Sequence, residues 1–282
     1  MKRVAKDFPG VVQLETSVRC NAHCLICPSQ YLKREDMTLE FAKGIIDQCV
    51  GRPVEVFHPY GYAEPLVWPH LESLISYIRD RLPTTQVVLY TNAALLGEEM
   101  AQILIDLGIA HITFSVDGVT AETYEAARPP LKLAAVIANI LRFLELNEAA
   151  GSPVTTRAHM TFTNRNRHEV PEFFKYWTGR VDEVTHRECD SRTEQFDGEP
   201  RCYTGCASSD PCAQPFAGMY IWCDGSVGMC CIDSGPETSM GNLHEQSMEE
   251  IWRGPVLSHV RELHNAGRKA EIPLCSTCSV MM

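Results

Sequence analysis

Short runs of apolar and β-branched residues alternate with longer amphipathic segments over the first two thirds of the chain. Short runs of this kind are typical of buried strands, and they predict strands at 11–18, 54–58, 86–91, 111–116, 154–161 and 181–187. The longer segments have apolar residues at helical spacing and predict helices at 39–50, 69–81, 97–107, 131–150 and 167–177. The alternating order predicts a mainly parallel sheet with helices on its outer face.

This order of strands and helices also predicts the position of the functional residues in the fold. Right-handed crossover connections bring the carboxyl ends of all parallel strands to one edge of the sheet, where α/β proteins place their functional groups. Six strand–helix units are too few for a closed eight-stranded barrel. We therefore expect an α/β fold with an open, partial barrel.

The alternation ends near residue 190. Residues 190–215 are rich in Gly, Pro, Ser and Asp without periodicity and predict a linker. Two short apolar runs, 219–223 and 227–231, flank Asp224-Gly225 and predict a β-hairpin, followed by short helices at 247–253 and 256–265. We expect two parts, 1–190 and 191–282, and the second is small enough to need a metal centre for its stability.

Composition excludes several classes of protein. The 282 residues include 25 Lys and Arg against 36 Asp and Glu, and the net charge of −11 opposes binding to nucleic acid or anionic membranes. A hydrophobic content of 45% with 22% charged residues is typical of globular proteins. The sequence has neither an apolar run of about 20 residues nor the apolar region of a secretory signal, so we expect a cytoplasmic protein.

The thirteen cysteines are the most informative residues. An odd number without an export signal argues against a disulfide framework and favours metal or catalytic thiolates in a reducing compartment. Cys20, Cys24 and Cys27 lie within eight residues of one another, directly after the first predicted strand. Eight more cysteines lie between residues 202 and 278. The distribution therefore predicts two separate metal sites.

The first three cysteines have the spacing to bind one side of an iron–sulfur cube. Such binding leaves one iron without a protein ligand, and an open metal position is where a substrate can bind. The alternative is a structural zinc site with His23 as the fourth ligand. His23 is adjacent to Cys24 and is poorly placed to chelate the same ion.

This C-x3-C-x2-C loop after a first strand resembles that of the radical S-adenosylmethionine (radical SAM) enzymes, which have a partial (β/α)6 barrel. Four further motifs match the family's order. The segment containing Gly61, Tyr62 and Glu64 resembles the one that meets the methionine amino group. Thr91 and Asn92, and then Ser115 and Asp117, match positions that face the sugar and the carboxylate, while Thr163 and Asn164 match an adenosine contact. Ile26 stands where the family usually has an aromatic residue, and its backbone could still meet the adenine.

The resemblance implies a one-electron mechanism. SAM would bind the open iron through its amino and carboxylate groups, and reductive cleavage would give a 5′-deoxyadenosyl radical that removes a hydrogen atom from the substrate. The protein would supply placement and exclusion of water. The implied partners are a small-molecule substrate and an electron donor of the flavodoxin or ferredoxin type, without nucleic acid or membrane.

Four later cysteines, Cys212, Cys230, Cys275 and Cys278, fit one closed site. Gly225-x4-Cys230 followed by a distant Cys-x-x-Cys resembles the shortened SPASM extension called the twitch subdomain. The resemblance implies a second, auxiliary [4Fe–4S] cluster. A structural zinc ion held by the same four cysteines is the alternative.

The remaining cysteines include one candidate for catalysis. Cys231 follows Cys230 directly, and adjacent side chains of an extended strand point to opposite faces. Cys231 could then face the barrel mouth and donate a hydrogen atom, protonated because apolar surroundings raise a thiol pKa. The alternative is a buried, inert cysteine. We expect Cys49 in the core, Cys223 packed within the hairpin, a possible further metal site at Cys202 and Cys206, and no assigned role for Cys189.

The leading hypothesis is a redox-neutral epimerase of a carbohydrate or aminoglycoside, with Cys231 as hydrogen-atom donor, by resemblance to aminoglycoside-tailoring enzymes of the neomycin type. The alternative is oxidation of a secondary alcohol, as in 2-deoxy-scyllo-inosamine dehydrogenase, with a base among Arg187, Asp190, Arg192 and Asp233. Peptide modification and a non-enzymatic zinc-binding protein are further alternatives. Candidate substrate contacts near the strand ends are His58, Tyr60, His159 and Glu188.

Overall fold

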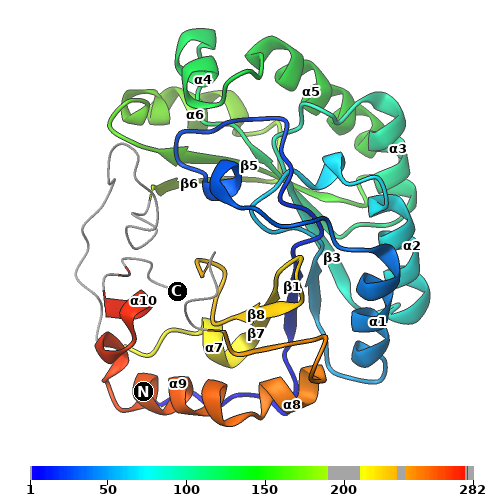
Figure 1. Cartoon of the computed structure of the whole chain (residues 1–282). Coiled ribbons are helices and arrows are strands. Elements are labelled where there is room, and N and C mark those ends of the chain that lie inside the picture. Colours follow the sequence, from blue (N-terminus) through cyan, green and yellow to red (C-terminus); the bar gives the residue numbers. More distant parts are fainter. Residues whose placement is uncertain (1, 190–209, 234–238, 277, 279–282) are drawn as a thin grey trace.

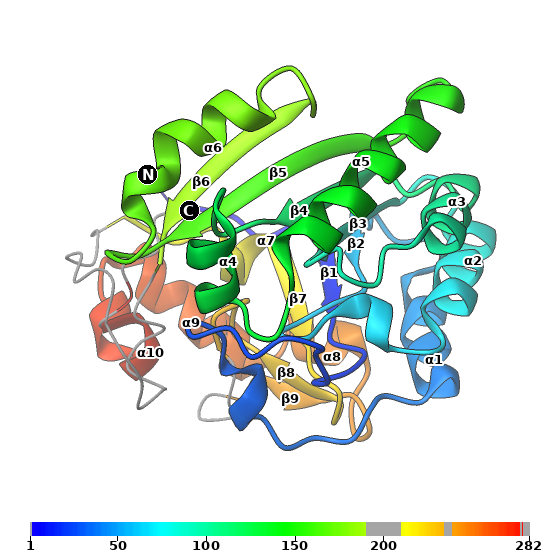
Figure 2. The ribbon, with the colours of Figure 1, turned by 90° about the horizontal axis from the view of Figure 1, so that it is seen from above.

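The computed structural model describes residues 2–189, 210–233, 239–276 and 278. In these ranges nine strands form one sheet in the order β6-β5-β4-β3-β2-β1-β7-β8-β9. Their bounds are β1 Val11–Leu14, β2 Val56–His58, β3 Gln86–Thr91, β4 His111–Ser115, β5 Thr155–Phe162, β6 Glu183–Glu188, β7 Gly218–Ile221, β8 Ser226–Gly228 and β9 Gly241–Asn242. Strands β1 to β6 are all parallel to their neighbours, which confirms the α/β fold class. The sheet curves as an open arc (Figure 2).

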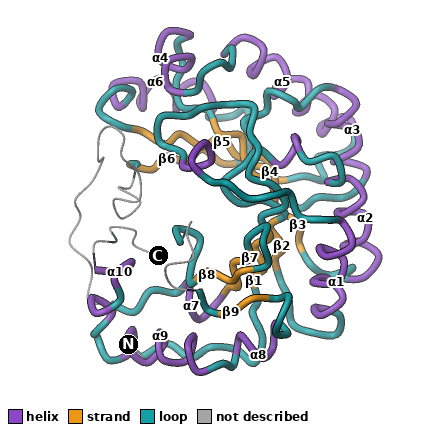
Figure 3. Tube along the Cα trace, viewed as in Figure 1, coloured by secondary structure: helices purple, strands orange, loops and turns teal. Residues whose placement is uncertain are grey.

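Helices cover the convex face of this arc, so the strands line the inside (Figures 1 and 3). They are α1 Leu39–Cys49, α2 Leu71–Arg81, α3 Glu98–Asp106, α5 Leu133–Ala149 and α6 Val170–Trp177. Each predicted helix is present within a few residues of its expected bounds. The short α4 (Ala121–Ala127) and the 3-10 helices η1 (Pro28–Tyr31), η2 (Pro65–Val67) and η6 (Lys269–Glu271) were not predicted, and the helix predicted at 167–177 begins with the 3-10 helix η3 (Arg167–Glu169).

The helical face of the sheet forms the main core. Phe57, Leu89, Phe114 and Met160 alternate along the strands with the residues of the other face and are fully buried. Helix α1 shows how the pattern works locally: the Thr38 side chain caps its first turn, and Ala42, Ile45, Ile46 and Cys49 form its buried stripe. The Cys49 sulfur lies 3.8 Å from the sulfur of Met248, in the core as expected.

The C-terminal segment contains the predicted hairpin, formed by β7 and β8. Strand β7 also pairs in parallel with β1, so the sheet continues from the first part of the chain into the second. Around it lie α7 (Gln214–Ala217), α8 (Met248–Trp252), α9 (Pro255–Asn265) and α10 (Pro273–Ser276). A division of the chain near residue 190 stays a prediction, and the pairing of β7 with β1 was not foreseen.

One local expectation was wrong. Strand β8 ends at Gly228, so Cys230 and Cys231 lie in a turn and not in an extended strand. A Cβ atom at Gly228 would lie 2.7 Å from Nε1 of Trp222, which explains the glycine. The turn closes because the Met229 amide donates to the Asp233 carboxylate at 3.0 Å and the Asp233 amide donates to the Cys230 carbonyl at 3.1 Å.

Strand register defines the face of the sheet opposite the helices, which we call the interior face. His58 and Tyr220 flank Gln13 on this face, and Arg157 lies between Thr113 and Glu183. These positions are polar, unlike those of the core. None of the helices in the described ranges is long and apolar enough to cross a membrane.

Candidate functional site

The first cysteine site is a loop that leaves the sheet after β1. Cys24 is buried, whereas Cys20 and Cys27 are half-buried, and a hydrogen bond of 3.1 Å from the Cys27 amide to the Cys24 carbonyl closes the loop. His23 is exposed and its amide donates to the Pro129 carbonyl at 2.6 Å. The loop therefore gathers three thiols and turns the histidine outward, as a cluster with three protein ligands requires.

Burial favours the protonated form of two of the thiols in this loop. Burial raises the pKa of Cys20 to about 11 and that of Cys24 to about 12. Metal ligation needs thiolates, so binding would release protons from these groups. Among the described residues, no three His, Cys, Asp or Glu side chains converge on a single ion. A cube is bound differently, since each thiolate binds its own iron.

A buried carboxylate, Glu64, lies beside the cysteine loop. It accepts hydrogen bonds from the Thr91 hydroxyl and the Asn92 amide, both at 2.7 Å. The Asn92 side chain in turn donates to Asn21 at 2.7 Å and lies 3.9 Å from the Cys20 sulfur. Burial raises the pKa of Glu64, although these hydrogen bonds oppose the shift. The structure thus brings together Glu64, Thr91, Asn92 and Cys20.

Gly61 is required by close packing next to this group. A Cβ atom at Gly61 would lie 2.6 Å from Cβ of Glu15. The Glu15 side chain is fully buried, pairs with Arg34 at 2.8 Å and accepts a hydrogen bond from the Tyr62 amide at 3.3 Å. Burial raises the pKa of Glu15, while Arg34 opposes the shift.

A buried ion pair, Asp117 with Arg128, lies on the other side of the loop. Both guanidinium nitrogens that face Asp117 contact its Oδ2 at 2.7 Å, and the Thr161 amide donates to its Oδ1 at 2.8 Å. Burial would lower the pKa of Arg128, but Asp117 and Cys24 more than offset this and raise it. Asp117 therefore positions Arg128 and β5, and the sequence patterns did not indicate Arg128.

A cavity of about 710 Å³ opens next to this pair. Ile26, Asp117 and Thr163 line it, as does Asn166. Asn166 is buried, donates to the Asp117 carbonyl at 2.9 Å and accepts from the Thr163 amide at 2.6 Å. Asn164, the residue expected from the sequence, is exposed and does not line the cavity.

The interior face carries a connected polar and aromatic group. The ring of Tyr60 contacts those of His58 and Tyr90, with centroids 5.4 and 5.3 Å apart. Arg157 donates to the Tyr90 hydroxyl at 3.3 Å and pairs with Glu183.

His159 lies on the same face, opposite Ser115 in register, and its Nδ1 is 2.9 Å from the Thr185 hydroxyl. Burial lowers the pKa of His159 to about 4, so its ring is neutral at pH 7. Glu188, another candidate, pairs with Arg167 and takes no part in this group.

The second cysteine site is assembled from three separate segments. Cys212, Cys230, Cys275 and Cys278 line one small cavity, together with Cys231 and His264. Cys212 precedes α7, Cys230 lies in the turn after β8, and the last two lie at α10. The donor set is that of a closed four-thiolate site, which suits an iron–sulfur cluster or zinc.

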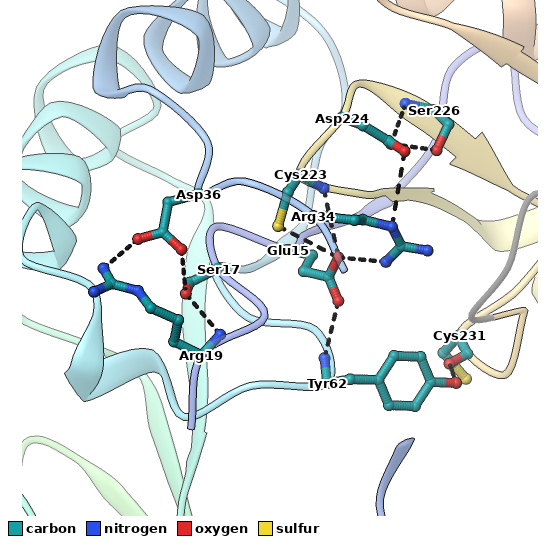
Figure 4. Close-up of polar contacts among 10 residues, drawn as sticks. All are labelled: Glu15, Ser17, Arg19, Arg34, Asp36, Tyr62, Cys223, Asp224, Ser226 and Cys231. Carbon is teal, nitrogen blue, oxygen red and sulfur yellow. Dashed lines mark hydrogen bonds and ion pairs between the residues drawn. The ribbon is translucent and has the colours of Figure 1, made fainter. Parts of the chain in front are cut away.

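Tyr62 lies between the two cysteine sites. Its carbonyl oxygen is 3.6 Å from the Cys27 sulfur, and its hydroxyl donates to the Cys231 carbonyl at 2.7 Å. Its ring is stacked on Trp222, with centroids 5.8 Å apart. Figure 4 shows Tyr62 reaching from the barrel towards Cys231.

A second contact between the two parts runs through Glu15. Arg34 lies between Glu15 and Asp224 of the hairpin, and the Cys223 thiol lies 3.4 Å from the Glu15 carboxylate (Figure 4). Cys223, expected to pack within the hairpin, therefore contacts the barrel.

Comparison with known proteins identifies the family. The radical SAM superfamily matches residues 14–176. The chain belongs to this superfamily. A SPASM iron–sulfur cluster-binding domain matches residues 212–279. The predicted resemblance is confirmed, as are SAM and iron–sulfur clusters as the cofactors.

One curated relative and two solved structures match this radical SAM chain over 91% or more of its length. The S-adenosyl-L-methionine-dependent 2-deoxy-scyllo-inosamine dehydrogenase of Niallia circulans is 21% identical over 278 residues, covering 96% of this chain and 92% of the relative. The crystal structure of BtrN in complex with AdoMet and 2-DOIA has a TM-score of 0.66 at 19% identity, covering 100% of this chain and 95% of that one. Streptococcus suis SuiB bound to precursor peptide SuiA has a TM-score of 0.74 at 14% identity, covering 91% and 67%.

Several predictions stay open. The ligand roles of the seven cysteines, the SAM contacts and the peptide-modifying alternative are not tested by these likenesses. Asp190, Arg192, Cys202 and Cys206 lie outside the described residues. Cys189 is buried and its amide donates to the Phe162 carbonyl at 2.8 Å, which gives it a place but no chemical role.

Proposed function

We propose that this radical SAM enzyme oxidises a secondary alcohol of a small polyhydroxylated ring, of the aminocyclitol or sugar class. The observation that carries the proposal is the match to 2-deoxy-scyllo-inosamine dehydrogenase, which spans both cysteine sites and leaves little of either chain unmatched. The polar interior face supports the same substrate class. Tyrosine hydroxyls, an arginine and a neutral histidine suit a ligand with many hydroxyl groups.

The first site has the groups that SAM binding needs. Cys20, Cys24 and Cys27 would hold the cluster, and when bound, cluster and SAM supply a carbon radical able to remove a hydrogen atom. Glu64 and Arg128 carry opposite charges and both act electrostatically on Cys20. They suit the amino and carboxylate ends of an amino acid. The cavity beside Ile26 and Asn166 would receive the adenosyl group.

Oxidation of an alcohol requires more than loss of one hydrogen atom. A proton and a second electron must also leave before a carbonyl forms. The four-cysteine site would hold the electron acceptor, and Tyr62 lies between it and the SAM site. His159 could accept the proton, because its ring is neutral and lies 2.9 Å from the Thr185 hydroxyl, and with a pKa of about 4 it would pass the proton on to solvent. Asp233 is less suited, since its carboxylate accepts the Met229 amide and holds the turn.

Epimerisation is the second candidate, favoured by the surroundings of Cys231. Cys231 packs against the cluster of Tyr62, Tyr220 and Trp222. Burial is the main cause of the raised pKa of Tyr60, and Cys231 lies near enough that a charge on it would add to that shift. A thiol there could return a hydrogen atom to a substrate radical. The hypothesis does not require an extended strand at Cys231, since the residue lies in a turn.

Product mass distinguishes the two reactions. The reconstituted enzyme would be incubated anaerobically with SAM, reductant and aminocyclitol or aminosugar alcohols, in H2O and in D2O. Oxidation predicts a product lighter by two hydrogens in both solvents. Epimerisation predicts unchanged mass in H2O and one added deuterium in D2O, and would replace the proposal.

The Cys231→Ala variant is the matched test. A dehydrogenase should retain most of its product formation, whereas an epimerase should lose inversion and still form 5′-deoxyadenosine. Loss of oxidation together with intact deoxyadenosine formation would contradict the assignment of Cys231 as a bystander.

A further inference from the structure

His264 lies inside the second cysteine site, between two cysteines that are far apart in sequence. It is located in the last turn of α9 and is only 1% exposed. The Cys212 amide donates to its Nδ1 at 3.2 Å, and its Nε2 lies 3.6 Å from the sulfur of Cys275. The edge of the ring faces Phe216, with centroids 6.4 Å apart, so aromatic packing also fixes its orientation.

The backbone contact determines which nitrogen carries the proton. A backbone N–H can only donate, so Nδ1 of His264 must be the acceptor of the Cys212 bond. In a neutral imidazole the single proton is then on Nε2. That N–H faces the sulfur of Cys275, which can accept it. The ring therefore links one cysteine's backbone to another's sulfur.

We propose that His264 is a positioning residue of the auxiliary iron–sulfur centre, donating an N–H···S hydrogen bond to Cys275 and raising the reduction potential of the centre. Reduction adds negative charge to the cluster and its thiolates, and a donor to a ligand sulfur stabilises that charge. The burial of the ring strengthens the effect, because a hydrogen bond is electrostatically stronger in a low-dielectric interior. The proposal requires Cys275 to be a ligand, and it holds whether the enzyme oxidises or inverts its substrate.

A second polar group lines the same cavity, and its effect on the reduction potential must be distinguished from that of His264. Lys269 lines the cavity, and its ammonium donates to the Asp210 carbonyl at 2.9 Å. A nearby cation also favours the reduced cluster, but through charge alone and without a bond to sulfur. Lys269→Met therefore measures the contribution of charge, and a variant at 264 measures that of the hydrogen bond.

The test is an EPR-monitored redox titration of the reconstituted holoenzyme without substrate. His264→Phe keeps an aromatic ring against Phe216 and removes both nitrogens. We expect the reduction equilibrium of the auxiliary centre to fall about tenfold, or about 59 mV for a one-electron couple. The cluster at Cys20, Cys24 and Cys27 should keep its potential. His264→Gln, which places an amide N–H at similar reach, should recover most of the shift.

His259→Phe is the matched control, because this histidine is exposed on the same helix. It should leave both potentials unchanged. An unchanged auxiliary potential in His264→Phe would overturn the proposal.

Labelling the histidines with ¹⁵N gives a readout in the wild-type enzyme that does not depend on the stability of any variant. ENDOR of the reduced auxiliary centre should show weak coupling to a histidine ¹⁵N, which distinguishes His264 from the backbone N–H groups near Cys230. Absence of that coupling would contradict the hydrogen bond, and a strong coupling typical of a directly bound nitrogen would show that His264 is instead a ligand. Because no substrate is present, failure here is distinct from failure of the proposed reaction.

Discussion

The two cysteine sites are built in opposite ways. Cys20, Cys24 and Cys27 lie in one short loop, and their neighbours Glu64, Asn92 and Arg128 come from the ends of successive strands and helices. The second site draws its cysteines from the segment before α7, the turn after β8, and α10 with the residues that follow it, and His264 lies among them. The first offers three thiols beside buried charges, and the second offers four thiols beside a buried histidine.

This difference indicates different tasks. A loop with three thiols leaves a coordination position for a ligand, and the buried charges beside it suit a zwitterion. A site with four thiols is closed to ligands and is suited to electron transfer or to stabilising the fold. The pairing of β7 with β1 brings the two sites onto one sheet, so each keeps a fixed position relative to the other.

The largest expected effects are the loss of one iron–sulfur cluster or the other, and they distinguish the functions of the two sites. Cys24→Ala should abolish formation of 5′-deoxyadenosine, because the loop loses a ligand, and should retain the iron of the auxiliary site. Cys275→Ala should lose auxiliary iron and product, while SAM is still cleaved. Iron and nucleoside counts on the reconstituted variants test this. If Cys275→Ala, correctly folded, formed no nucleoside, the two sites would not be independent.

The next largest effect is expected on stability, when the buried ion pair of Asp117 and Arg128 is broken. Arg128→Met leaves the Asp117 carboxylate buried without its cation, and should lower the free energy of unfolding by about 3–5 kcal/mol. Urea denaturation at neutral pH measures the change. The control is Arg142→Met, whose pairs with Glu98 and Glu145 are exposed and should contribute little. Equal stability of the two variants would contradict the importance of the buried pair.

A smaller effect is expected at the cavity. Asn166→Ala leaves the Thr163 amide and two carbonyl groups without their partner, and should cost about 1–3 kcal/mol of stability. Asn164→Ala, at an exposed position, should change stability by less than about 0.5 kcal/mol. The Michaelis constant for SAM should rise only in the first variant. The reverse order would favour Asn164, as predicted from the sequence, over Asn166 as the adenosine contact.

The smallest effect concerns the contact between the sites. Tyr62→Phe removes only the hydroxyl that donates to the Cys231 carbonyl and should cost about 1 kcal/mol of stability. The variant should also retain less auxiliary iron than the wild type during dialysis. Tyr77→Phe, whose hydroxyl bonds to the exposed Asp47, is the matched control and should behave as wild type. Identical behaviour of the two variants would show that the contact is dispensable.

Much of the fold was predictable because its patterns are local. Strand β3 occupies the predicted residues 86–91, and α1 differs from its prediction by one residue. Helix α4 was missed because its seven residues are too few for a clear apolar stripe. The turn at Cys230 and Cys231 was missed because it depends on Asp233 and on contact between Gly228 and Trp222.

The site was predictable to a different degree for each residue. Glu64 and Asp117 stand in motifs, but the roles of Arg128 and Asn166 depend on hydrogen bonds to residues distant in sequence. His264 lies within an amphipathic pattern and resembles any other residue of a helix face. Only its contacts with Cys212 and Cys275 distinguish it.

By itself, the sequence determined the strand–helix alternation, the spacing of the first three cysteines and, through them, membership of the radical SAM superfamily. These properties depend on neighbours a few residues apart, which a linear pattern records. The tertiary structure alone decided that β7 joins β1 and that a histidine lies among the four cysteines that the sequence had grouped. Those outcomes follow from long-range pairing and packing, which no local pattern contains.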